Sequence, residues 1–154
     1  MTTPTGSRSI CFTAIGAVSA AMVFTAPLAA AEPQASADKL CDFIYPTPDD
    51  FEVIANSTAI AVSNADGAVH LELHTDANSE TPYEQRFSVI WANLDTGRNG
   101  SEQVTATVQG PDNVLSIPRV VTEPGRIAFV LAAANHGSDQ NYTNGDCSAE
   151  YTVR

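Results

Sequence analysis

Residues 68–75 read AVHLELHT, and this stretch alternates strictly between apolar and polar side chains. Val69, Leu71 and Leu73 fall on one side of an extended chain, and the polar residues between them fall on the other. Successive side chains of a β-strand point to opposite faces of its sheet. The pattern therefore predicts a strand with one face in a core and the other in water.

Short segments of the same β-type recur on both sides of this stretch, separated by turn sequences such as Asp66-Gly67. None of them shows a sustained apolar period of 3.6 residues, so no helix is expected. We expect seven or eight strands, drawn from residues 41–45, 51–63 (with a break at Asn56-Ser57), 68–75, 87–94, 104–108, 114–121, 127–134 and 147–153.

Residues 87–94 (FSVIWANL) are apolar on both faces and carry the only tryptophan of the chain, which predicts a central strand. Phe87, Val89 and Trp91 share one face of it and are expected to fill the core. Pro118 interrupts the strand at 114–121, because proline donates no ladder hydrogen bond. That strand is therefore expected at an edge, or to change sheets there.

Without helices to cover the apolar face of a sheet, a second sheet must pack against it. The expected fold is an all-β, immunoglobulin-like antiparallel sandwich of seven or eight strands. An Ala-, Asp- and Thr-rich β-domain with turns such as 93–100 (NLDTGRNG) resembles the small secreted immunoglobulin-like antigens of actinobacteria. The resemblance would cover residues 32–154, and it assigns no functional residue.

Residues 1–31 have the features of a secretory signal peptide: Arg8 near the start, an apolar run at 10–25, Pro27, and three alanines before Glu32. The alternative is that this segment stays on the protein as an N-terminal anchor. We expect residues 32–40 to form a flexible leader and residues 41–154 to form a single domain. The expected location is extracellular or in the cell envelope.

Removal of residues 1–31 would take Cys11 away and leave two cysteines, Cys41 and Cys147, near the two ends of the remaining chain. Exported proteins meet an oxidising environment in which two thiols can pair. The sequence therefore predicts a disulfide between Cys41 and Cys147 that ties the start of the domain to its end.

The charge of the chain excludes two classes of partner. All 18 acidic residues follow position 31, where they face only six lysines and arginines, a net charge of −12. Nucleic acids and anionic membranes are bound through basic patches, so neither is expected as a partner. No segment after residue 31 is apolar enough to span a bilayer.

Two segments contain residue types that can bind a metal ion. His70 and His74 share a strand face with Glu72, but four residues of strand separate the two histidine positions by about 13 Å, too far to share one ion. The polar stretch 135–146 (NHGSDQNYTNGD) offers oxygen ligands, but its spacing differs from that of a calcium loop. We expect no metal and no cofactor.

No sequence motif of nucleophilic, phosphate-binding or metal-dependent catalysis is present. We therefore expect a non-catalytic binding or structural module whose partner is a protein or an envelope component. Recognition is expected in the polar loops 76–85, 95–100 and above all 135–146. The candidate binding residues are His136, Asp139, Asn141 and Tyr142.

Two other classes of function remain open. One is an envelope hydrolase or metal-dependent enzyme, which clustered carboxylates in a cleft would favour. The other is a carrier that holds a small hydrophobic ligand between its sheets, which a large apolar pocket would favour.

Overall fold

The structure is a computed structural model and describes residues 37–63 and 66–154. The expected signal peptide lies outside the described residues. The eight strands are β1 (Ala37–Pro46), β2 (Ile54–Ser63), β3 (Ala68–Asp76), β4 (Tyr83–Asn93), β5 (Asn99–Val108), β6 (Asn113–Val121), β7 (Gly125–His136) and β8 (Tyr142–Val153). A single 3-10 turn, Ser138–Gln140, is the only helical element among these residues.

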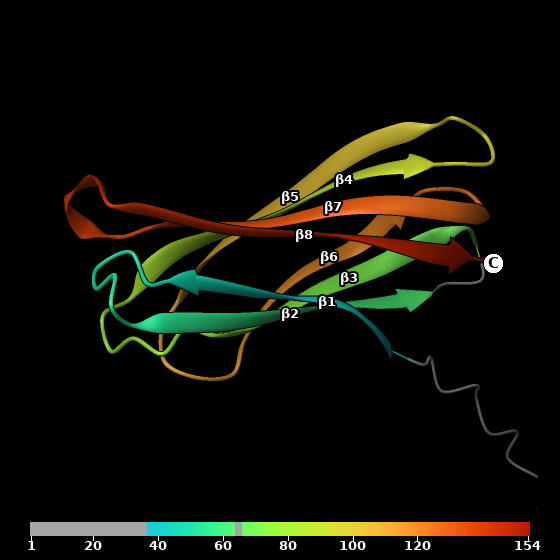
Figure 1. The fold of residues 1–154 in the computed structure, drawn as a ribbon. Helices are drawn as coiled ribbons and strands as arrows, with labels where there is room; N and C mark the ends of the chain where they lie inside the picture. The colour runs from blue at the N-terminus through green and yellow to red at the C-terminus, as the bar shows by residue number, and fades with distance from the viewer. Residues whose placement is uncertain (1–36, 64–65) are drawn as a thin grey trace, which may run out of the picture. The chain divides into compact units, whose positions relative to one another are not determined.

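The strands form two antiparallel sheets of four, in the orders β1-β2-β3-β6 and β5-β4-β7-β8 (Figure 1). The chain crosses between the sheets after β3, after β5 and after β6, so that β3 pairs with β6 and β4 pairs with β7. The predicted all-β, immunoglobulin-like sandwich is confirmed, with eight strands.

The core lies between the two sheets and follows the alternation of side chains along each strand. On β4 the side chains of Phe87, Val89 and Trp91 are buried, as predicted, and β4 lies inside its sheet rather than at an edge. Gly100 pairs with Trp91, and a Cβ at Gly100 would come within 2.8 Å of the indole ring. The apolar side chain of Ile90 points to the outer face instead, where 61% of it is exposed.

The expected effect of Pro118 is also confirmed. β6 is the edge strand of its sheet. Its register against β3 shifts at the proline, because Val69 faces Val120 while Leu71 faces Ile117. β6 has one extra residue at this point, which forms a β-bulge. The bulge places Pro118, which has no N–H, where no hydrogen bond to β3 is required.

The disulfide between Cys41 and Cys147 is present, as predicted. Cys41 lies on β1 and Cys147 on β8, which are edge strands of different sheets. The bond therefore joins the two layers across one open side of the sandwich, and it links residues 106 positions apart.

Several predicted boundaries are wrong. β1 begins at Ala37, so the expected leader 32–40 already contains strand residues. β2 runs without a break from Ile54 to Ser63. The polar stretch 135–146 is mostly strand, because β7 ends at His136 and β8 begins at Tyr142, and the end of 76–85 is also strand, because β4 begins at Tyr83. The connections are therefore only 77–82 and 137–141. The residues that flank them are strand, but they are polar on both faces, so the sequence does not show an alternation of apolar and polar residues there.

Replacing the indole by a methyl group tests the core. We expect Trp91→Ala to lower the free energy of unfolding by about 3–5 kcal/mol, because the large cavity beside Gly100 cannot collapse fully. The matched control is Val114→Ala on β6, whose side chain is 50% exposed and is expected to change stability by only about 0.5 kcal/mol. Chemical denaturation measures both, and equal effects would contradict the packing described.

Removing the disulfide tests its contribution. The double variant Cys41→Ser/Cys147→Ser should lose about 2–5 kcal/mol of stability, because the unfolded chain gains the freedom that the cross-link removed. Reduction of the unchanged protein should give the same midpoint of denaturation as the double variant. A reduced protein as stable as the oxidised one would rule out a structural role for the bond.

Candidate binding site at the loop end

Four connections between strands gather at one end of the sandwich, which we call the loop end. They are the β1–β2 connection (47–53), the β3–β4 connection (77–82), the β5–β6 connection (109–112) and the β7–β8 connection (137–141) (Figure 1). The strand pairings require this arrangement, since Pro46 pairs with Ile54, Tyr83 pairs with Val108 and Glu84 pairs with His136.

Hydrogen bonds tie these connections to one another in pairs. Asp49 accepts two bonds at its Oδ1 atom, from the backbone N–H and the hydroxyl of Ser138, each at 2.9 Å. The backbone of Gly110 accepts from Ala77 N–H and donates to the carbonyl of Ser79, both at 2.9 Å. The loop end is thus a cross-linked surface rather than four independent loops.

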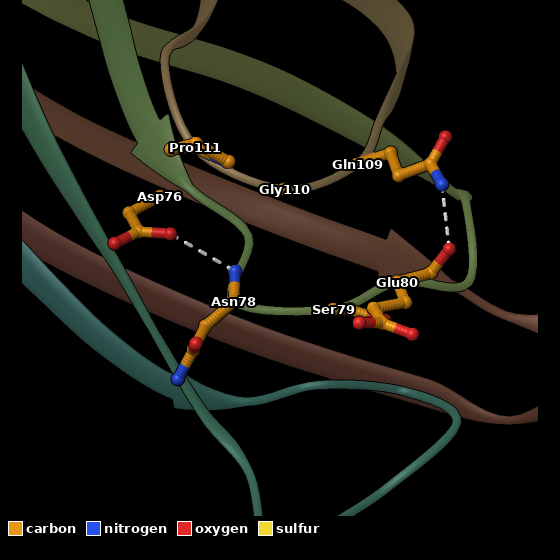
Figure 2. Close-up of a pocket in the computed structure, with 7 residues that line it drawn as sticks. All are labelled: Asp76, Asn78, Ser79, Glu80, Gln109, Gly110 and Pro111. Atoms are coloured by element: carbon orange, nitrogen blue, oxygen red, sulfur yellow. Dashed lines mark hydrogen bonds between the residues drawn. The ribbon is translucent and has the colours of Figure 1, made fainter.

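The larger hollow at the loop end, about 630 Å³, lies between the β3–β4 and β5–β6 connections (Figure 2). Gln109 closes one side by donating from Nε2 to the carbonyl of Glu80 at 2.6 Å. The lining residues are Asp76, Asn78, Ser79, Glu80, Gln109, Gly110 and Pro111. A surface with these groups suits a polar ligand or a partner loop rather than an apolar molecule.

Of the four predicted binding residues, the structure brings two together. The rings of His136 and Tyr142 stack across the β7–β8 pair, with centroids 4.5 Å apart and an angle of 2° between their planes. Both line a recess of about 270 Å³. Asp139 and Asn141 lie in the turn between them and do not line this recess.

The histidines of β3 are closer in space than their backbone positions suggested. Both imidazoles lean toward Glu72 and contact its two carboxylate oxygens, at 3.3 Å from His70 Nε2 and 2.8 Å from His74 Nε2. His70 Nε2 also lies 2.7 Å from the hydroxyl of Ser116. Even so, no group of three or more His, Cys, Asp or Glu side chains in residues 37–63 and 66–154 is arranged to hold a metal ion.

Directly beneath the loop end, polar side chains from six strands form a buried layer between the sheets. Thr75 Oγ1 donates to Gln85 Oε1 at 2.8 Å, and Gln85 Nε2 donates to Tyr45 Oη at 2.7 Å. Ser57 Oγ lies 2.7 Å from Thr75 Oγ1 and 2.6 Å from Tyr45 Oη. The four residues Tyr45, Ser57, Thr75 and Gln85 therefore close a ring, which we call the polar ring.

The direction of every bond in the polar ring follows from proton counting. Each hydroxyl has one proton to donate. Because Thr75 donates to Gln85, Ser57 must donate to Thr75, and Tyr45 must then donate to Ser57. All four bonds run the same way round, an arrangement in which neighbouring bonds polarise and strengthen one another.

The polar layer extends from this ring to β7 and β8. The second N–H of Gln85 Nε2 is donated to Asn135 Oδ1 at 2.9 Å, and Asn135 Nδ2 donates to Thr143 Oγ1 at 3.3 Å. Each of β1, β2, β3, β4, β7 and β8 thus contributes one member, close to the point where it enters or leaves the loop end. The layer fixes the strand ends that carry the connections.

Tyr83 lies beside the polar ring without joining it. Its hydroxyl is buried and has no hydrogen-bond partner among the described residues. Burial, followed by proximity to Tyr45, raises the pKa of the Tyr83 hydroxyl far above its usual value. Burial likewise raises the pKa of Tyr45, although its hydrogen bonds oppose the shift. Both groups favour the fold below the ordinary tyrosine pKa of about 10, and this stabilisation is lost as the pH rises through the folded-state values.

The polar layer was not predicted from the sequence, although one signal for it exists. Thr75 is in phase with the buried positions of β3, Gln85 with those of β4 and Asn135 with those of β7. A polar residue at an inward position near a strand end identifies such a layer only once the strand ends are known.

Comparisons with protein families, with characterised proteins and with solved structures found no match to this chain. No helix among the described residues has the length and apolar character to cross a bilayer.

Two substitutions that each remove one hydroxyl group test the polar layer. Tyr45→Phe should cost about 1–3 kcal/mol, because it leaves one N–H of Gln85 unpaired in the interior and removes the donor to Ser57 Oγ. Tyr83→Phe removes an unpaired hydroxyl and should leave the free energy of unfolding unchanged or slightly raised. Denaturation at neutral pH compares the two variants, and a larger loss for Tyr83→Phe would show that the hydrogen bonds are wrongly placed.

Proposed function

We propose that the protein is a non-catalytic binding module of the extracellular space or the cell envelope, and that it holds its partner at the loop end. The observation that carries this proposal is the gathering of four cross-linked connections on a buried hydrogen-bonded layer. A rigid scaffold that presents several loops at one end is a common arrangement for recognition. The disulfide is compatible with an oxidising location.

Two aromatic side chains supply the expected energy of binding. Phe51 in the β1–β2 connection is 56% exposed, and Tyr142 at the start of β8 is 63% exposed. Aromatic residues dominate binding energy at interfaces because they bury a large area with few rotatable bonds. A protein or envelope component with an apolar group flanked by hydrogen-bonding groups fits this surface.

The dense interior favours a binding module over a carrier. The inward side chains of both sheets pack into one core, and the hollows described above are lined by connections and by outward-facing residues. The hydrolase alternative keeps one supporting feature, the contact of Glu72 with two histidines. That contact lies on the outer face of β3, where His74 lines an open hollow of about 240 Å³ together with Asp76 and Asp112.

Partner capture tests the proposal. The immobilised protein is exposed to culture filtrate and to a cell-wall extract, and the captured component is quantified. We expect Phe51→Ala/Tyr142→Ala to reduce capture about ten-fold or more, since each aromatic anchor contributes at least ~1 kcal/mol. The matched control is Leu94→Ala, an exposed apolar residue at the opposite end, which should capture as the unchanged protein does.

The same assay separates binding from metal-dependent chemistry. Capture should survive a chelator and the substitutions His70→Ala and His74→Ala. If chelation or either histidine variant abolished capture while Phe51→Ala/Tyr142→Ala retained it, the enzyme alternative would replace this proposal.

A further inference from the structure

The outer face of the β5-β4-β7-β8 sheet carries an apolar ridge far from the polar residues of the loop end. Ile90 on β4 and Val130 on β7 pair directly across the sheet, and they are 61% and 49% exposed. We propose that two copies of this chain pack face to face through this ridge, as an isologous dimer.

The shape of the face fits a second copy of itself. Shallow troughs flank the ridge on both sides, one of about 540 Å³ toward β5 and one of about 260 Å³ toward β8. The trough beside β8 is lined by Ala128, Phe129, Val130, Ser148, Ala149 and Glu150. Ridge and trough lie next to each other, so a two-fold rotation can place Ile90 of each copy in the trough beside β8 of the other, with the two Val130 side chains meeting at the axis.

The register of the strands defines where that axis lies. A two-fold axis along β7, parallel to the strands and between the two faces, places β4 of each copy over β8 of the other. Ile90 then lies over Ser148 of the second copy, because both pair with Val130 at the same level of the sheet. Sheets packed with nearly aligned strands are a common arrangement.

The same axis brings opposite charges together. Arg86 pairs with Ala134, which pairs with Asn144, so Arg86 of one copy lies over Asn144 of the other, one outward residue away from Asp146. Arg86 has no ion pair among the described residues.

The carboxylates of β8 meet uncharged residues across the same interface. Asp146 shares its level with Ser88, and Glu150 shares its level with Ala92. No carboxylate therefore opposes a carboxylate on β4 and β8, although the chain as a whole is strongly acidic.

The area of the face agrees with a weak, reversible dimer. Three strands of each copy, β4, β7 and β8, overlap across this axis, and nine residues along each give roughly 430 Å² per copy from the usual strand spacing and rise. The total of about 900 Å² is smaller than a standard specific interface and falls in the range of weak, transient ones. We therefore expect the dimer to form only at the higher protein concentrations of the experiment below.

The experiment is sedimentation velocity on the protein as its host produces it, over micromolar to millimolar concentrations. We expect a concentration-dependent monomer–dimer equilibrium that Val130→Asp weakens about ten-fold or more, by placing two carboxylates at the axis. The matched control is Val114→Asp, equally exposed on the outer face of the other sheet, which should leave the equilibrium unchanged.

A charge exchange keeps the test decisive if Val130→Asp fails to fold. Arg86→Asp and Asp146→Arg should each weaken the dimer, and the double variant should restore it. A monomer at every concentration, a dimer that Val114→Asp disrupts and Val130→Asp does not, or a double variant no better than its parents would each overturn the proposal. Arg86 lines the same recess as His136 and Tyr142, whereas Val130 lies outside it, so Val130→Asp is the variant that separates dimerisation from loop-end capture.

Discussion

The polar ring constrains the rest of the molecule more than any single apolar contact. A buried hydroxyl or amide without a partner costs free energy, so the four members must stay in register with one another. They belong to four strands and lie 10 to 40 residues apart along the chain. A slip of β1, β2, β3 or β4 would leave several of these groups unpaired at once. Apolar side chains can repack after a small displacement of a strand, whereas the hydrogen bonds of the polar ring would break. The polar ring thereby fixes the strand ends that carry the loop end.

Much of the fold was predictable because it depends on local patterns. The alternation at Val69, Leu71 and Leu73 gave a half-buried strand, and Trp91 identified a strand inside a sheet. Pro118 indicated an edge strand or a change of sheets, because proline lacks the N–H that an interior ladder position requires, and β6 is an edge strand. Two cysteines after residue 31 left a single pairing to predict.

The candidate site was less predictable, because its parts are distant in sequence. The stretch 135–146 is polar throughout and predicts a loop, yet Asn135 and Thr143 lie on strands, point inward and bond to each other. The contact of Glu72 with both histidines depends on side-chain conformations that strand spacing alone does not define. Of the predicted binding residues, His136 and Tyr142 meet because β7 and β8 continue further than their composition suggests.

The strand arrangement also places the loop end and the outer ends of β1 and β8 at opposite ends of the sandwich. β1 starts and β8 finishes at the end opposite the loop end, and Tyr151 near the end of β8 donates to Asp38 near the start of β1 at 3.2 Å. An attachment directly at the start of β1 or at the end of β8 therefore points the loop end outward, away from whatever holds the chain. A tag, a resin or a cell surface attached there leaves the four connections accessible, whereas attachment through a loop would bury them.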